Sequence, residues 1–134
     1  KNLTIINDSK STSFASSENL LKNLKNVYWI IGGIPKKGDQ FNLSKKHCKN
    51  FKTFIFGDNH EEFKRNFKNK ISVNNFTNLR DILNEIFFDL KNKKLKKNII
   101  FFSPAGASFD GFKNFEDRGK YFNQLVKKFL NAKR

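Results

Sequence analysis

Short runs of apolar residues alternate along the chain with stretches in which apolar residues recur at helical spacing. The short runs are closed by glycine, proline or asparagine and are typical of buried strands. The other stretches keep their apolar side chains on one stripe, which is typical of amphipathic helices. The predicted strands are 3–6, 27–31, 53–56, 71–73 and 98–102, and the predicted helices are 14–24, 61–67, 79–90 and 114–130, with Ser13 and Thr77 as N-caps of the first and third helices.

This alternation of strand and helix predicts an α/β fold. Parallel strands joined by right-handed helical crossovers place helices on both faces of the sheet, so we expect a Rossmann-like, three-layer domain with a mostly parallel sheet. The length of 134 residues fits a single domain, 1–134. One core is therefore expected.

Three unusual polar and glycine-rich segments each follow a predicted strand. They are 7–13, 32–39 and 103–110. Because ligands in such sheets bind at the carboxyl ends of the strands, we expect these segments to lie along one edge and to line one site. The glycines before Lys36 are expected to let the backbone turn and a ligand approach closely.

The formal net charge of +15 raises the possibility of a nucleic-acid partner. Lys, Asn, Ile and Phe are all frequent, however, as an AT-rich coding sequence would produce. The basic residues are spread along the chain, and 91–97 is the one tight run. We favour a solvated basic surface, and a basic nucleic-acid-binding module stays open as the alternative.

The cysteine count and the pattern of apolar residues indicate the cellular compartment of the protein. Cys48 is the only cysteine, and no stretch resembles a signal peptide or reaches the length of a membrane helix. These features predict a cytoplasmic protein. The chain has no Met and opens directly into a strand-like run, so we expect it to be a piece excised from a larger enzyme.

Motifs that carry a complete reaction are missing from the sequence. We find no nucleophile triad, zinc spacing or phosphate-binding P-loop. His47, Cys48 and His60 are too few and too scattered for a metal site. We therefore assign no catalytic residue and no metal ligand, and interpret the polar segments as binding groups.

The polar segments resemble a known family. Asn7-Asp8-Ser9-Lys10-Ser11-Thr12, the loop Gly32-Gly33-Ile34-Pro35-Lys36, and the run from Ser103-Pro104-Ala105-Gly106 to Asp117-Arg118-Gly119 are similar, in order and spacing, to the C-terminal domain of the Mur ligases. The resemblance covers essentially the whole chain. It is closest to the members that add D-glutamate to the peptidoglycan precursor. A sibling ligase that adds another amino acid and a folylpolyglutamate synthase-like ligase are the alternatives within this class.

The resemblance implies a three-domain, ATP-dependent amide ligase. In such an enzyme the N-terminal domain holds UDP-N-acetylmuramoyl-L-alanine, and the central domain holds ATP and Mg²⁺. The C-terminal domain closes over both and brings in D-glutamate, whose amine attacks a carboxylate activated as an acyl phosphate. The resemblance thus implies that this chain is a ligand-binding domain, inactive by itself.

It also implies roles for individual residues, listed at the end of this paragraph. A dicarboxylate such as D-glutamate requires a fixed cation and hydroxyl donors, which provide charge-assisted hydrogen bonds. An acidic residue at a strand end suits ribose hydroxyls, although helix capping is the alternative for Asp8. Core packing is the alternative for Phe115. By the resemblance, Asp8 and Lys10 face the nucleotide, and Thr12, Lys36, Ser108 and Phe115 surround the amino acid, with the backbone of Phe109 assisting.

Overall fold

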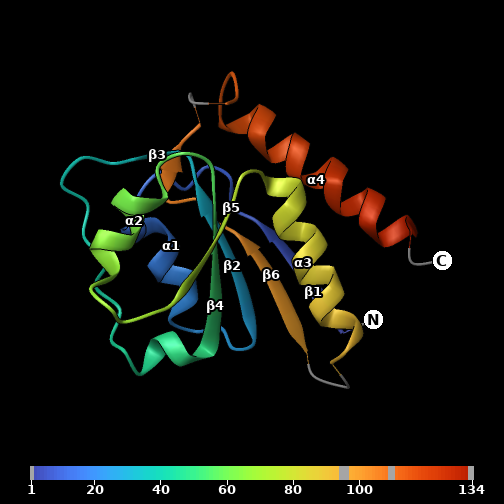
Figure 1. Cartoon of the computed structure of the whole chain (residues 1–134), viewed down its shortest axis with the longest axis horizontal. Coiled ribbons are helices and arrows are strands. Elements are labelled where there is room, and N and C mark those ends of the chain that lie inside the picture. The colour runs from blue at the N-terminus through green and yellow to red at the C-terminus, as the bar shows by residue number, and fades with distance from the viewer. Residues whose placement is uncertain (1, 94–96, 109–110, 133–134) are drawn as a thin grey trace.

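The computed structural model describes residues 2–93, 97–108 and 111–132, and strands and helices alternate along them as expected. Figure 1 shows their arrangement. The elements are β1 (Leu3–Asn7), α1 (Phe14–Leu21), β2 (Val27–Gly32), β3 (Ile34–Pro35), a 3₁₀ turn (His47–Asn50), β4 (Phe51–Phe56), α2 (His60–Phe67), β5 (Val73–Phe76), α3 (Leu79–Lys91), β6 (Asn98–Phe102), β7 (Gly106–Ala107) and α4 (Phe115–Ala132).

The main sheet has five strands in the order β1-β6-β2-β4-β5, and every neighbouring pair is parallel. The central strand β2 is buried along its whole length, as its continuous apolar sequence predicts. Its neighbours β6 and β4 pair with it through their apolar residues Ile100–Phe102 and Phe54–Phe56. Helices can therefore cover both faces of this sheet.

Alternate residues of β2 point to opposite faces and define two cores. Trp29 and Ile31 pack in the cluster that contains Phe14 of α1 and Phe63 of α2. Tyr28 and Ile30 pack in the cluster formed with α3 and α4. Figure 1 shows α1 and α2 on one side of the sheet and α3 and α4 on the other. The three-layer, Rossmann-like fold is confirmed.

Two predicted boundaries differ from the structure. Helix α1 ends at Leu21 instead of residue 24, because tighter turn bonds follow: Asn23 N donates to Leu20 O and Leu24 N to Leu21 O. The strand predicted at 71–73 lies at Val73–Phe76 instead. Its position is set by pairing with β4, from Thr53 opposite Val73 to Phe56 opposite Phe76, and not by its own weak apolar pattern.

One of the two predicted N-caps is confirmed, and the other is wrong by one residue. Ser13 caps α1, and its side chain accepts a hydrogen bond from Ser16 N. Helix α3 is capped by Asn78 and not by Thr77, since the Asn78 side-chain oxygen accepts from Asp81 N at 2.9 Å. Either residue type can cap, and one position of register decides which side chain reaches the first turn. In the parts of the chain that the structure describes, no helix is long and apolar enough to cross a membrane.

Candidate functional site

The three polar segments meet at one edge of the sheet. They follow β1, β2 and β6, which are adjacent strands, at their carboxyl ends. Backbone hydrogen bonds join the segments just beyond the strands: Asp8 N donates to Phe102 O at 2.7 Å, and Gly32 N donates to Pro104 O at 3.1 Å. The segments therefore form one continuous carboxyl edge, as the parallel topology predicts.

A small second sheet joins the Lys36 segment to the Ser108 segment. β3 and β7 are antiparallel, with Ile34 opposite Ala107 and Pro35 opposite Gly106. Lys36 and Ser108 thus leave this ladder at opposite ends, about 10 Å apart along the strand direction by the usual rise per residue. A ligand that touches both side chains must cross the ladder.

Gly33 is required by this second sheet. Its φ is +102°, and a Cβ at this position would lie 2.3 Å from Ala107 O. The sharp turn that we expected from Gly32-Gly33 is present. The space left by the missing side chain, however, is filled by the β7 backbone instead of a ligand, so that part of the expectation is corrected.

Arg118 of α4 is the central positioning residue of the edge. It is fully buried, with 0% of its surface exposed. Its Nε donates to Ser9 Oγ at 3.1 Å, and its terminal nitrogens donate to Gly106 O at 2.8 Å and Ser9 O at 2.5 Å. The planar guanidinium can bind several carbonyls at once, and it thereby ties α4 to the segments after β1 and β6.

A chain of hydroxyl groups holds Asp8 in place. Ser103 Oγ donates to Asp8 Oδ2 at 2.7 Å, and it lies 2.5 Å from Ser17 Oγ, which is 2.8 Å from Ser11 Oγ. No described residue donates to the other carboxylate oxygen, Oδ1. Because Ser13 caps α1, the alternative that Asp8 is a helix cap does not hold.

The Lys36 loop is fastened to the start of α1. Asp39 N donates to Lys36 O at 3.1 Å, and the Asp39 carboxylate accepts from Phe14 N at 2.7 Å. This contact brings the Lys36 loop to the end of the segment that contains Thr12. Sequence reasoning missed Asp39 because its partner is a backbone amide 25 positions away.

The residues predicted for the site are mostly solvent-facing. Lys10, Thr12 and Lys36 are exposed, and their side chains form no hydrogen bond or ion pair with the described residues. Ser108 is buried, and no described residue is bonded to its Oγ. Phe109 lies outside the described residues. Cationic and hydroxyl donors are thus available at this edge.

Phe115 is the first residue of α4 and is 41% exposed, so the alternative of core packing is wrong for it. The first residue of a helix has no preceding turn on which its side chain can pack. The Phe115 ring therefore extends beyond the buried residues of α4. Its backbone oxygen accepts from Ser9 Oγ at 2.7 Å. That bond places an exposed phenyl ring beside the segment after β1.

The histidines and the cysteine have ordinary structural surroundings. Burial raises the pKa of the Cys48 thiol to about 11, which keeps it protonated at neutral pH. His47 Nδ1 lies 3.0 Å from Ser44 Oγ, and His60 Nε2 lies 3.5 Å from a Glu61 oxygen. Over residues 2–93, 97–108 and 111–132, no group of three or more His, Cys, Asp or Glu could hold a metal ion.

Comparison with known proteins identifies relatives. No family model matches the chain. It is 37% identical over 132 residues to the UDP-N-acetylmuramoylalanine--D-glutamate ligase of Wolbachia from Brugia malayi, with 98% of this chain aligned. The proteins of the same name from Wolbachia pipientis wMel and Rickettsia felis are 38% and 33% identical over 93% and 95% of this chain. The chain spans about a quarter of the length of these relatives (26%, 24% and 28%) and matches their C-terminal part.

Proposed function

Because this chain belongs to the Mur ligase family and aligns with the C-terminal part of UDP-N-acetylmuramoylalanine--D-glutamate ligases, we propose that it is the amino-acid-binding domain of such an enzyme. The full-length protein then joins D-glutamate to UDP-N-acetylmuramoyl-L-alanine at the expense of ATP, in the synthesis of the peptidoglycan precursor. Residues 1–134 form its C-terminal domain, and the reaction takes place in the cytoplasm.

The observation that carries this proposal is the set of available donors at the carboxyl edge. Lys36, Thr12 and Ser108 belong to segments that are bonded to one another, yet none of their side chains is used by a described residue. A lysine ammonium and two hydroxyls match the charge and hydrogen-bonding needs of a dicarboxylic amino acid. The exposed ring of Phe115 offers an apolar surface to its methylene groups.

Asp8 and Lys10 would serve the nucleotide. Ser103 fixes one carboxylate oxygen of Asp8, and the other can accept hydrogen bonds from ribose hydroxyls. Lys10 is exposed two positions later and would add positive charge beside the phosphates. ATP with Mg²⁺ supplies the phosphoryl group that activates the muramoyl-alanine carboxylate. We assign the phosphates and Mg²⁺ mainly to the central part of the full-length enzyme.

The work of this chain is then to bind and orient. Lys36 neutralises a carboxylate of D-glutamate, the hydroxyls of Thr12 and Ser108 fix its rotation, and the amine is left facing the activated carboxylate. Orienting two reactants in this way lowers the entropic part of the barrier. Arg118 and the hydroxyl chain at Asp8 keep the segments after β1 and β6 in register while the ligand is bound.

The test is the amino-acid dependence of phosphate release by the full-length enzyme. With ATP, Mg²⁺ and UDP-N-acetylmuramoyl-L-alanine present, D-glutamate should support phosphate release, and L-glutamate, D-alanine and L-lysine should not. Release that depends on a different amino acid would assign the chain to a sibling ligase. The 134-residue chain in the same mixture should release no phosphate above background, and sustained turnover by it would contradict the domain assignment.

A further inference from the structure

The backbone is held on both sides of Lys36. Before it, Pro35 pairs with Gly106 in the small second sheet. After it, Asp39 N donates to Lys36 O at 3.1 Å and closes a tight turn, in which Gly38 has the positive φ, +76°, that the third position of a type II turn requires. Asp39 therefore follows Lys36 within a single turn, and a shift of Asp39 would move Lys36 with it.

The Asp39 side chain connects this turn to the segment that contains Thr12. Its Oδ2 accepts a hydrogen bond from Phe14 N at 2.7 Å, and its Oδ1 accepts one from Gln40 N at 3.0 Å. Phe14 is the first residue of α1, so its N–H has no partner within the helix and lies at the positive end of the helix dipole. Both carboxylate oxygens are thus bonded to backbone amides, which fixes the orientation of the side chain.

The core anchors the residue to which Asp39 is bonded. Phe14 is 1% exposed and Phe41 is 5% exposed, and their rings pack edge to face with the centroids 5.6 Å apart. Both rings belong to the buried cluster on the side of the sheet that α1 and α2 cover. Phe14 N is therefore a fixed point, and the Asp39 carboxylate holds the turn of Lys36 at a set distance from it.

We infer that Asp39 is a positioning residue for the amino-acid substrate, because it sets the spacing between the Lys36 ammonium and the Thr12 hydroxyl. This inference rests on the function proposed above. Lys36 and Thr12 are exposed and form no side-chain bond with the described residues, so the backbone decides where these donors lie. Arg118 ties the segments after β1 and β6, and Asp39 adds a tie to the segment after β2.

The test is steady-state kinetics of Asp39→Ala in the full-length enzyme. The KM for D-glutamate should rise about tenfold, because displaced donors bind the dicarboxylate less well, and the KM for ATP should change by less than about twofold. Asp39→Asn keeps one acceptor oxygen at the same distance and loses the charge. Its KM for D-glutamate should lie between those of the unmodified enzyme and Asp39→Ala, and it serves as the test variant if Asp39→Ala does not fold.

A double-mutant cycle with Lys36→Ala separates positioning from a general structural role. If Asp39 acts through Lys36, adding Asp39→Ala to Lys36→Ala should raise the KM for D-glutamate by less than about twofold more, since the donor that Asp39 positions is already missing. A residue that only stabilises the fold would raise this KM by the same factor in both backgrounds.

Glu18 of α1 offers a matched control. Its Oε2 accepts from Asn42 N at 3.0 Å, so it ties the same loop to the same helix, but beyond Phe41. Glu18→Ala therefore removes a hydrogen bond between loop and helix, as Asp39→Ala does. Because Phe41 is anchored in the core between the two ties, Glu18→Ala should leave the KM for D-glutamate within about twofold of the unmodified enzyme.

An unchanged KM for D-glutamate in a folded Asp39 variant would overturn the inference, and so would effects of Asp39→Ala and Lys36→Ala that simply multiply. An equal rise in Glu18→Ala would also overturn it, because that result would show a general loosening of the loop. Failure of the proposed function is seen separately, in the amino-acid dependence of the unmodified enzyme. If that enzyme uses a different amino acid, the proposed function fails, and the same cycle is measured with that amino acid as the substrate.

Discussion

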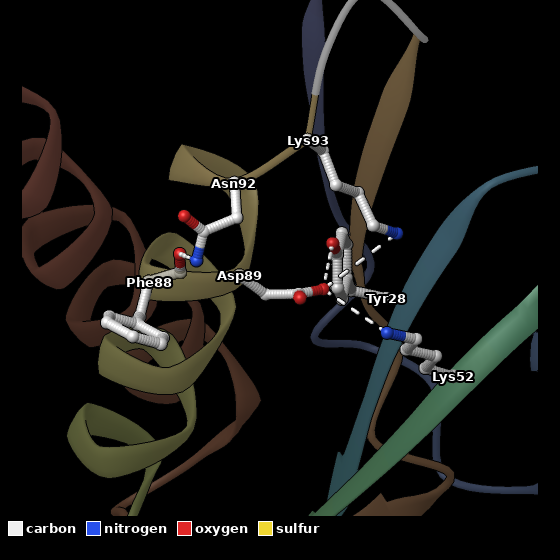
Figure 2. A network of polar contacts seen from close by, with 6 residues as sticks. All are labelled: Tyr28, Lys52, Phe88, Asp89, Asn92 and Lys93. Atoms are coloured by element: carbon white, nitrogen blue, oxygen red, sulfur yellow. Dashed lines mark hydrogen bonds and ion pairs between the residues drawn. The ribbon is translucent and has the colours of Figure 1, made fainter.

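Polar side chains form contacts at both ends of the main sheet, but these contacts contribute different amounts to the stability of the fold. At the carboxyl end, Arg118 is fully buried and bonded to carbonyls of Ser9 and Gly106. At the amino end, Tyr28, Lys52 and Lys93 converge on one carboxylate oxygen of Asp89 (Figure 2), at 2.6, 3.3 and 3.8 Å. Figure 2 also places this cluster where the last turn of α3 meets β2 and β4.

The Arg118 contacts and the Asp89 cluster differ in how far they are buried, and burial decides how much each contributes to stability. The amino-end lysines and Asp89 keep a third or more of their side chains exposed, and such ion pairs contribute little because water screens them. Arg118 has no access to water and must be satisfied by the protein. The segments after β1 and β6 are therefore joined through a buried guanidinium, whereas the Asp89 cluster is a partly exposed surface contact.

The largest effect is expected from Arg118→Met. Removing the guanidinium leaves the carbonyls of Ser9 and Gly106 buried without donors, so the free energy of unfolding should fall by about 3–5 kcal/mol. Lys52→Met at the amino end is the matched change and should cost less than about 1 kcal/mol. Denaturant unfolding measures both, and equal losses would remove the contrast between the two ends.

A second effect concerns the β3–β7 contact. Gly33→Ala combines a φ of +102° with a clash against Ala107 O, and should destabilise the chain by about 3 kcal/mol. Gly38→Ala is the control, since its φ is +76° but no atom lies within 4 Å of the added Cβ. It should cost only about 1–2 kcal/mol, the penalty of the left-handed backbone. Thermal unfolding of the pair isolates the close approach.

The smallest effect is a pH dependence at the amino end. The Tyr28 hydroxyl, and then Lys52, hold the pKa of Asp89 below its usual value. A lowered folded pKa means that the ionised carboxylate stabilises the fold above the unfolded pKa near 4, and that this contribution is lost as the pH falls through the folded pKa. The loss should stay below about 1 kcal/mol because the cluster is partly exposed.

Tyr28→Phe tests the cause of that shift. Without the hydroxyl, the pKa of Asp89 should rise towards its usual value, which NMR titration of the side-chain carboxyl measures. Asp89→Asn should flatten the acid side of the stability curve. An unchanged Asp89 pKa in Tyr28→Phe would assign the shift to the two lysines instead.

Strands and helices could be predicted from the local pattern of apolar residues. Contacts with backbone groups far away in the sequence could not. Continuous apolar runs such as Val27–Ile31 identify buried parallel strands, and the topology then places the segments after β1, β2 and β6 together. The two-residue strands β3 and β7 are too short to show any periodicity. The role of Arg118 was not predictable from its neighbours in sequence, because its partners are carbonyls more than ten positions away.

Lys36 is proposed to hold a carboxylate of D-glutamate at the carboxyl edge. The most direct test is steady-state kinetics of Lys36→Ala in the full-length enzyme, with Lys37→Ala, the exposed neighbour in the same loop, as control. A lost charge-assisted contact should raise the KM for D-glutamate by about one to two decades and leave the KM for ATP little changed. A D-glutamate response equal to that of Lys37→Ala, or a loss confined to ATP, would contradict the claim.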